Sequence, residues 1–337
     1  MQGSTSSSKS NGLMRAAIAV ERGVIRCEEV EIPQIKPGEV LVQTMAASIC
    51  GSDLHMVNTG WGMHAFPAMA GHTGHEAAGR IVESRSEKFA VDDLVLTVPF
   101  IWDSRCFADF QAVDDEHVLK LDAGTDFDTI TLAQQLGTVV YAAKRLPASL
   151  EGQTCVVVGQ GSAGLFWDFT LKQLGAEKII SIEPLAWRRE LGKSYGVDQT
   201  IDVIGDAAVD AVKDMTNGAG ADLVIEAVGS TPTLSQVFHL VRQAGQVVLF
   251  GLPESEDPVP FDYSQMFKIR ANTFTVLGSQ DEPGLPSYVE AVRLISTGVI
   301  DVEPIISHRI NISEIDRAFR IAGERLDNAV KVGITFD

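Results

Sequence analysis

The six residues Gly159-Gln160-Gly161-Ser162-Ala163-Gly164 constrain the fold of this chain more than any other segment. They follow the apolar run Cys155–Val158 and open a helix-like stretch at residues 163–174. Glycines at this spacing permit a tight turn between a strand and a helix, and they let the backbone approach a ligand closely. The first turn of such a helix presents free backbone N–H groups to an anion. The segment therefore predicts a strand–turn–helix unit that binds a pyrophosphate.

The residues after this turn alternate between short apolar runs and helix-like stretches. Strand-like runs occur at residues 178–182, 221–226 and 246–250, and a second helix-like stretch occurs at 187–195. Buried strands that are joined by helices predict a doubly wound parallel sheet, an α/β fold with helices on both faces. We expect this domain to span residues 148–282.

The remainder of the chain has a different pattern. Short strand-like runs broken by turns, such as residues 16–20 and 39–43, indicate a β-rich domain. Near the end of the chain strand-like runs return around one helix at 313–322, and we expect this stretch to pack back on the first domain. The β-rich domain is therefore expected to comprise residues 14–147 and 283–337.

Composition excludes several classes of function. The formal net charge of −18 argues against binding to nucleic acid or to an anionic membrane surface. The four cysteines are scattered, so we expect no disulfide framework and a location in the reducing cytoplasm. No apolar run reaches the ~18 residues of a membrane span. Residues 1–13 are rich in serine, and we expect a disordered tail or a cloning remnant there.

An acidic residue follows the glycine-rich turn at the distance that a nucleotide site requires. Glu183 ends the next strand-like run, where a carboxylate would bind the adenosine ribose hydroxyls. Its charge favours NAD over NADP, because a 2′-phosphate would meet a like charge. Arg188 and Arg189 lie nearby and could favour NADP, although we interpret them as a solvated helix face.

Two segments of the β-rich half bring together groups that suit a metal ion. One is Cys50-Gly51-Ser52-Asp53-Leu54-His55, and the other is Gly74-His75-Glu76. Thiolate, imidazole and carboxylate are the ligands that zinc prefers, and a hydroxyl with a second imidazole could carry a proton away. Asp53 could orient His75 by accepting its second N–H. Taken singly, Cys50 could be a small buried hydrophobe and His75-Glu76 an ordinary polar pair.

With these motifs in this order, the chain resembles the medium-chain dehydrogenase/reductases of the zinc-dependent alcohol dehydrogenase type, and within them the polyol and threonine dehydrogenase branch. The resemblance extends from Met14 to Asp337 and includes the ending from Glu303 to Thr335. It implies a GroES-like β-rich catalytic domain into which a Rossmann domain is inserted.

The resemblance also implies roles for individual residues. Cys50 and His75 match two catalytic zinc ligands, and Glu76 matches an acidic neighbour that can also bind the metal. Ser52 matches the hydroxyl of the proton relay and His55 its outer member. Thr138 matches a position beside the nicotinamide, although a helix hydroxyl bonded to a carbonyl is the alternative. The expected cofactor-binding residues are Gly159, Gly161, Ser162, Ala163, Gly164, Glu183, Arg188 and Thr138.

The chain departs from the family pattern at two places. Residues 99–107 are too short for the lobe that holds a structural zinc with four cysteines, and they contain only Cys106, so we expect no structural zinc. The remaining catalytic ligand falls on Gln134, whose neutral amide is a poorer zinc ligand than a thiolate or carboxylate. Gln134 is therefore expected to be a weak ligand at most, and a weakly held or missing zinc stays open. We interpret His72 as a loop histidine without a metal role.

Together with these features, the resemblance implies an NAD-dependent, zinc-dependent oxidoreductase, with NADP possible, that acts on a polar secondary alcohol or polyol. A zinc-free reductase of activated double bonds is one alternative, and a non-catalytic nucleotide-binding protein is another. The expected partner is a small molecule, with no nucleic acid and no membrane. The family implies a homodimer or homotetramer whose edge strand near Thr273–Leu277 pairs with its copy. Whether Trp61, Phe66 and Trp102 line the substrate pocket or only pack stays open.

Overall fold

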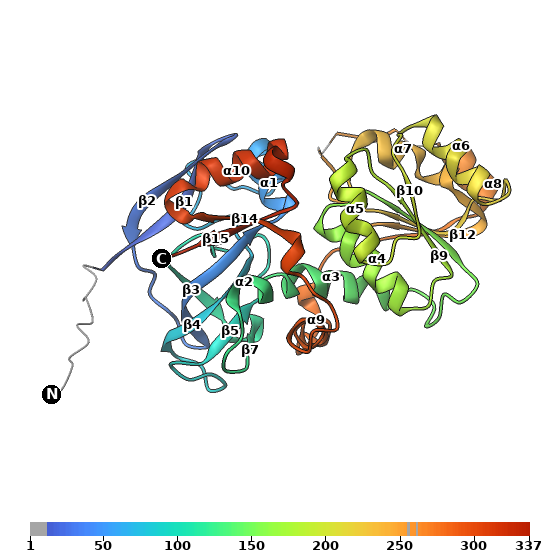
Figure 1. Cartoon of the computed structure of the whole chain (residues 1–337). Helices are drawn as coiled ribbons and strands as arrows, with labels where there is room; N and C mark the ends of the chain where they lie inside the picture. The colour runs from blue at the N-terminus through green and yellow to red at the C-terminus, as the bar shows by residue number, and fades with distance from the viewer. Residues whose placement is uncertain (1–11, 255–256, 261) are drawn as a thin grey trace.

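The computed structural model describes residues 12–254, 257–260 and 262–337. It contains two lobes, a β-rich lobe that carries the first and last described residues and a lobe built on a parallel sheet (Figure 1). The tail expected over residues 1–13 lies outside the described residues except for Gly12 and Leu13, and Leu13 already begins the first strand. None of the helices in the described ranges is long and apolar enough to cross a membrane.

The α/β lobe is a six-stranded sheet in the order β10-β9-β8-β11-β12-β13, with all neighbouring strands parallel. The predicted doubly wound sheet is thus confirmed, and its strand order changes direction between β8 and β11, where such folds bind ligands. The elements are β8 (Thr154–Val158), α4 (Ser162–Gln173), β9 (Lys178–Ile182), α5 (Ala186–Ser194), β10 (Gln199–Ile201), α6 (Asp206–Met215), β11 (Ala221–Glu226), α7 (Thr231–Leu240), β12 (Val241–Leu249), α8 (Tyr263–Ile269) and β13 (Asn272–Thr275).

Alternate residues of β8 pack on opposite faces of this sheet. Val157 shares one apolar core with Leu165 of α4, whereas Val156 shares another with Val212 of α6. A strand that is buried on both faces must be apolar at every position, which explains its uninterrupted Val-rich sequence.

The turn after β8 has the conformation that its glycines permit. Gly159 adopts a left-handed φ of 93°, which costs a residue with a side chain more than it costs glycine. A Cβ at Gly164 would lie 2.0 Å from the carbonyl oxygen of Gly159, so a side chain there would push the helix off the turn. Helix α4 begins directly after Gly161 with no side chain capping its first N–H groups. Those N–H groups are therefore available to an anion.

The β-rich lobe contains a seven-stranded sheet and a separate hairpin, β1–β2. The sheet follows the order β14-β15-β3-β4-β5-β7, and β6 pairs with β3. The elements are β1 (Leu13–Glu21), β2 (Val24–Glu31), β3 (Glu39–Ile49), α1 (Gly51–Thr59), β4 (Glu76–Ser84), β5 (Leu94–Thr97), β6 (Phe110–Asp114), β7 (Val118–Lys120), α2 (Phe127–Ile130), α3 (Ala133–Ala143), α9 (Pro286–Ser296), β14 (Ile306–Asn311), α10 (Ile315–Glu324) and β15 (Lys331–Thr335). Short 3₁₀ turns cover Asp115–His117, Ser279–Asp281, Glu303–Ile305, Ile312–Glu314 and Leu326–Asn328.

The last strand lies beside the strands that carry the two sequence motifs. β15 pairs antiparallel with β3, placing Val332 opposite Ile49, and β3 pairs with β4, placing Ser48 opposite Glu76. The expectation that the end of the chain packs back on the first domain is confirmed. This register brings the start of β15, the end of β3 and the start of β4 to one place.

The two lobes share part of their interior. Leu96 and Leu136 of the β-rich lobe belong to the same apolar core as Leu165 and Ile225 of the α/β lobe. Helices α3 and α9 lie between the two sheets (Figure 1). We keep 148–282 as the proposed extent of the α/β domain.

Candidate active site

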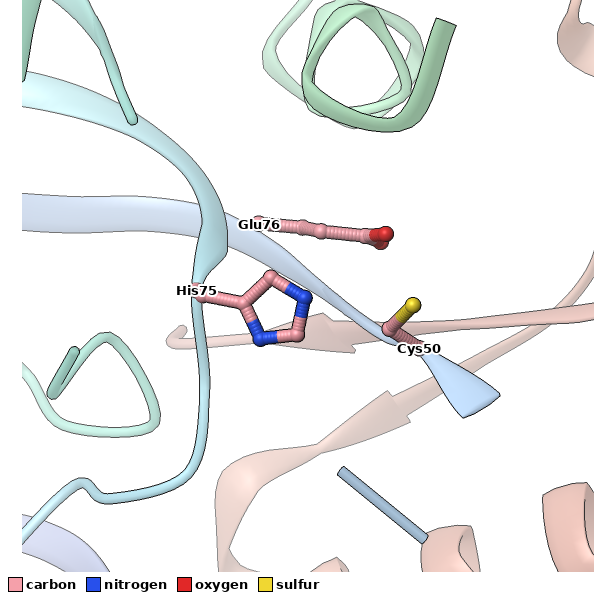
Figure 2. Close-up of side chains that lie close together, drawn as sticks. All are labelled: Cys50, His75 and Glu76. Atoms are coloured by element: carbon pink, nitrogen blue, oxygen red, sulfur yellow. The ribbon is translucent and has the colours of Figure 1, made fainter. Parts of the chain in front are cut away.

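Cys50, His75 and Glu76 meet where β3 ends and β4 begins (Figure 2). One ligand atom from each lies within 4.8 Å of the other two. Cys50 is half-buried, whereas His75 and Glu76 are buried. A thiol, an imidazole and a carboxylate at this spacing can contact a single metal ion.

Asp53 holds both motifs in place. Its carboxylate accepts a hydrogen bond of 2.7 Å from the backbone N–H of Cys50, which caps α1, and one of 2.8 Å from the Thr73 hydroxyl. The ring Nδ1 of His75 lies 3.1 Å from the same carboxylate, as the sequence predicted. This contact leaves His75 Nε2 to face the cleft, where it lies 3.3 Å from the Ser52 hydroxyl.

The electrostatics around His75 favour a charged or metal-bound imidazole. Burial lowers the pKa of His75, but the charge and hydrogen bond of Asp53 and the nearby Cys50 raise it more, so that its pKa lies well above the ordinary value. The surroundings thus supply negative charge that a cation at Nε2 would offset.

Glu76 is paired with a lysine that the sequence analysis missed. Lys331, 1% exposed, places its Nζ 2.7 Å from Glu76 Oε2 and 3.0 Å from Oε1. The Ser48 hydroxyl also donates to Glu76 Oε2. Burial lowers the pKa of Lys331, whereas Glu76 and Cys50 raise it, and the pKa is raised overall. Only the register of β15 against β3 and β4 brings Lys331 here, and no local sequence pattern reveals it.

Helix α3 presents two glutamines to the same cleft. Gln134, the expected weak ligand, is buried and lines the cleft. Its neighbour Gln135 is the residue that contacts the thiol, with Nε2 3.6 Å from Cys50 Sγ. Thr138, one turn further on, lines the cleft and also donates to the carbonyl of Gln134 at 3.4 Å.

Of the two other histidines near the motifs, His55 lines the cleft and His72 does not. His55 lies on α1 and lines the cleft, with its ring 5.4 Å from that of Trp61. His72 is buried with Nδ1 3.0 Å from the Ser104 carbonyl and does not belong to the metal-binding group found among the described residues.

The carboxylate of Glu183 orders the glycine-rich turn. Its oxygens accept hydrogen bonds from the backbone N–H groups of Gln160 at 2.9 Å and Leu185 at 3.0 Å.

The interpretation of Arg188 as part of a solvated helix face is wrong. Arg188 is buried, and its Nη2 donates at 2.7 Å to the carbonyl of Ala329 in the other lobe. This partner is 141 residues away in sequence, so helix periodicity could not show it.

A cavity of about 350 Å³ connects the group of Cys50, His75 and Glu76 to the glycine-rich turn. Its wall includes Cys50, Ser52, His75 and Ala163. None of the three aromatic residues considered for the substrate pocket lines this cavity, although Ile101 does. Trp61 instead lines a neighbouring apolar cavity of about 550 Å³, and the two cavities share Phe250, Gly251, Leu252, Val276 and Leu277.

Comparisons with known proteins cover both lobes. Residues 36–158 match the model of the alcohol dehydrogenase GroES-like domain, and residues 164–295 match that of the zinc-binding dehydrogenase. L-threonine 3-dehydrogenase of Pyrococcus abyssi is 29% identical over 307 residues, which cover 83% of this chain and 86% of that protein. Scyllo-inosose 3-dehydrogenase of Thermotoga maritima is 29% identical over 340 residues, covering 86% and 85%. The crystal structure of an alcohol dehydrogenase from Thermotoga maritima matches with a TM-score of 0.81 at 25% identity, covering 96% of this chain and 100% of that one.

Proposed function

Because this chain belongs to the zinc-binding alcohol dehydrogenase family of medium-chain enzymes, we propose that it interconverts a polar secondary alcohol or polyol and its carbonyl product, with NAD and zinc. The observation that supports this most is the group of Cys50, His75 and Glu76 in the wall of a cleft that also contains Ala163 of the nucleotide-binding turn.

The donor set fits zinc. Cys50 and His75 present a sulfur and an imidazole nitrogen, which are the zinc ligands that proteins use most. Glu76 adds a carboxylate, although both of its oxygens are already bonded by Lys331. Cys50 and His75 would therefore hold the ion most strongly, with Glu76 supplying a further oxygen or compensating charge. When bound, zinc would supply Lewis-acid polarisation of the alcohol oxygen, and NAD would supply the hydride acceptor.

Ser52 and His55 are the residues that we infer move the proton of the alcohol. The Ser52 hydroxyl lies beside His75 Nε2 at 3.3 Å, so a substrate oxygen next to the metal ligands would lie within its reach. A hydroxyl can accept one proton while it donates another, and an imidazole can exchange protons with water. Both residues line the cleft, so the proton can leave through groups of this chain.

The nucleotide site favours NAD. The free N–H groups at the start of α4 suit the pyrophosphate, and Glu183, directly after the next strand, is the carboxylate that we expect to bind the ribose hydroxyls. A 2′-phosphate would meet this negative charge. The guanidinium of Arg188 already donates a hydrogen bond to the carbonyl of Ala329, so we do not count Arg188 as a group that would favour NADP.

The substrate class rests on the relatives and on the polar groups of the cleft. The names of the relatives describe oxidation of threonine and of a cyclic polyol derivative. In this chain the side chains of Ser52, His55, Gln134 and Gln135 line the cleft beside the metal ligands. These groups can hydrogen-bond a substrate with more than one oxygen.

The test combines metal analysis with a spectrophotometric screen of alcohols and polyols in the presence of NAD or NADP. We expect bound zinc and NAD reduction in the wild-type protein, and loss of both in Cys50→Ser. Ser52→Ala should keep its zinc while kcat falls by about 10²-fold or more, because only the proton relay is removed. Cys27→Ser, in the hairpin, is the matched cysteine control. A Cys50→Ser enzyme with full zinc content and full activity would refute the proposal.

A further inference from the structure

We propose that the side-chain amide oxygen of Gln135 is a ligand of the zinc ion, in the place that the sequence pattern assigns to Gln134. The proposal rests on the zinc site proposed above and concerns which residues of this chain complete it. The observation behind it is the side-chain amide of Gln135, whose nitrogen contacts the Cys50 thiol while its oxygen has no partner within the described residues.

The amide of Gln135 is poorly satisfied by the protein alone. Its Nε2 makes a weak contact of 3.6 Å with Cys50 Sγ. Its Oε1 is buried and has no hydrogen-bond partner within the described residues. A buried carbonyl oxygen without a partner is unfavourable and needs an explanation such as a bound ion. Half a turn of the planar amide would exchange its two ends: the oxygen would then lie beside the thiol, where an ion could bind it, and the NH₂ group would take the place that the oxygen has now.

The distance to Cys50 suits two ligands of one ion. Zinc–sulfur bonds are about 2.3 Å and zinc–oxygen bonds about 2.1 Å, so a tetrahedral angle separates the two donors by about 3.6 Å. The amide end of Gln135 lies 3.6 Å from Cys50 Sγ. The atom at this distance is the amide nitrogen, and after the half-turn the amide oxygen would occupy its position, at the separation that a shared metal requires.

Helix geometry separates Gln135 from Gln134. Consecutive residues of an α-helix point about 100° apart, so the two amides face different parts of the cleft. Within the described part of the chain, no hydrogen bond joins the Gln134 side chain to Cys50, His75 or Glu76. The contact that exists is made by Gln135.

A neutral amide has a consequence for metal affinity. An amide oxygen contributes no charge, whereas thiolate and carboxylate ligands each contribute one negative charge and bind zinc more tightly. A carboxylate at position 135 should therefore strengthen zinc binding, and removal of the amide should weaken it.

The experiment measures zinc affinity by competition with a chromophoric chelator and records the visible spectrum of the cobalt-substituted protein, which reports the ligand set independently of turnover. The full-length variants are Gln135→Ala, Gln135→Glu and, as the adjacent matched control, Gln134→Ala. We expect Gln135→Ala to weaken zinc binding by about tenfold or more and to change the cobalt spectrum. Gln135→Glu should bind zinc more tightly than wild type, a gain that misfolding cannot produce. Gln134→Ala should keep the wild-type affinity and spectrum.

The outcomes separate this proposal from the proposed function. If wild type binds zinc and Gln135→Ala keeps the same affinity and cobalt spectrum, the assignment of Gln135 is overturned while the alcohol dehydrogenase function stands. Loss of zinc in Gln134→Ala alone would likewise assign the ligand to Gln134. If the wild-type protein binds neither metal, both proposals fail.

Discussion

Lys331 carries a positive charge into the interior, where it forms an ion pair with the carboxylate of Glu76. The ammonium is 1% exposed and lies 2.7 Å from Glu76 Oε2. Removing one partner of a buried ion pair leaves the other charge uncompensated in a medium of low dielectric constant. The pair therefore links β15 to β4 beside the metal ligands.

Lys331→Met should destabilise the protein by about 3–5 kcal/mol, measured by urea denaturation, because it leaves the Glu76 charge unpaired. Lys120→Met is the control, since Lys120 forms an exposed ion pair with Asp93 and should change stability by at most about 1 kcal/mol. The double variant Lys331→Met, Glu76→Gln should recover part of the loss, because no lone charge remains. Equal, small effects of the two lysine variants would contradict this account of the pair.

At the scale of elements, the seam between α4 and the glycine-rich turn contains a buried carboxyl group. Both oxygens of Asp168 are buried without a hydrogen-bond partner in the described part of the chain. Burial raises the pKa of Asp168 well above its ordinary value, although the nearby Gln160 side chain lowers it somewhat. Gln160 belongs to the turn itself, so the protonation of Asp168 is linked to the glycine-rich turn that we propose as the nucleotide site.

Asp168→Asn should make the protein more stable at alkaline pH and flatten its dependence of stability on pH. The protonated Asp168 carboxyl contributes to the free energy of unfolding. That contribution is fully present below the pKa of an unfolded aspartate, about 3.9, and is lost as the pH rises toward the raised pKa of Asp168 in the folded protein. The amide of the variant cannot ionise, so the free energy of unfolding of Asp168→Asn should exceed that of wild type by an amount that grows with pH to the order of 1–3 kcal/mol. Urea denaturation across the pH range measures it, with the exposed Asp210→Asn as control. A wild-type stability that rises with pH relative to Asp168→Asn would contradict the prediction.

The sequence predicts some elements of this structure well for physical reasons. The strands of the parallel sheet are buried on both faces, so their apolar runs are continuous and easy to recognise. The turn at Gly159–Gly164 carries its own steric requirements in its glycines. By contrast, the short helix α1 begins directly after Cys50, and its first residues are the chemical motif itself, so apolar periodicity does not reveal it.

The site is predictable only where its residues are close in sequence. Cys50 and His75-Glu76 stand out because they form two compact motifs. Lys331 and the partner of Arg188 depend on pairings between distant segments, which no local pattern encodes. The orientation of Gln135 depends on the rotation of α3 about its axis, and one residue of helix is enough to move the contact away from Gln134.

At the scale of the whole molecule, the site depends on how the two lobes are held together. Arg188 of α5 donates to Ala329, two residues before Lys331 at the start of β15. A shared apolar core joins the lobes elsewhere. Helix α5, which begins shortly after Glu183, is thus connected through Ala329 to the short stretch of chain that carries Lys331 and its ion pair with Glu76. The proposed nucleotide site and the proposed metal site are therefore linked by a direct hydrogen bond between the lobes that carry them.

The outer edge of the parallel sheet is the surface where we expect a second copy of this chain to bind. β13 pairs with β12 on one side and ends the sheet on the other, within the described residues. Large apolar side chains lie on the adjoining helix α8, where Phe267 is 72% exposed and Tyr263 is 66% exposed. α8 and β13 also line one apolar cavity. An open edge beside exposed apolar groups generally requires a cover, and pairing with a copy of itself supplies one.

We therefore expect the wild-type protein to sediment as a dimer or a larger even-numbered assembly, and the double variant Phe267→Glu, Asn272→Lys to sediment as a monomer. Charges on an edge strand and its neighbouring helix oppose pairing because they must lose their hydration on association. Val91→Glu is the control, since Val91 is a comparably exposed apolar residue, 53%, in the β-rich lobe. Analytical ultracentrifugation at several concentrations measures the masses. A monomeric wild-type protein, or a double variant that keeps the wild-type mass, would show that this edge is not the interface.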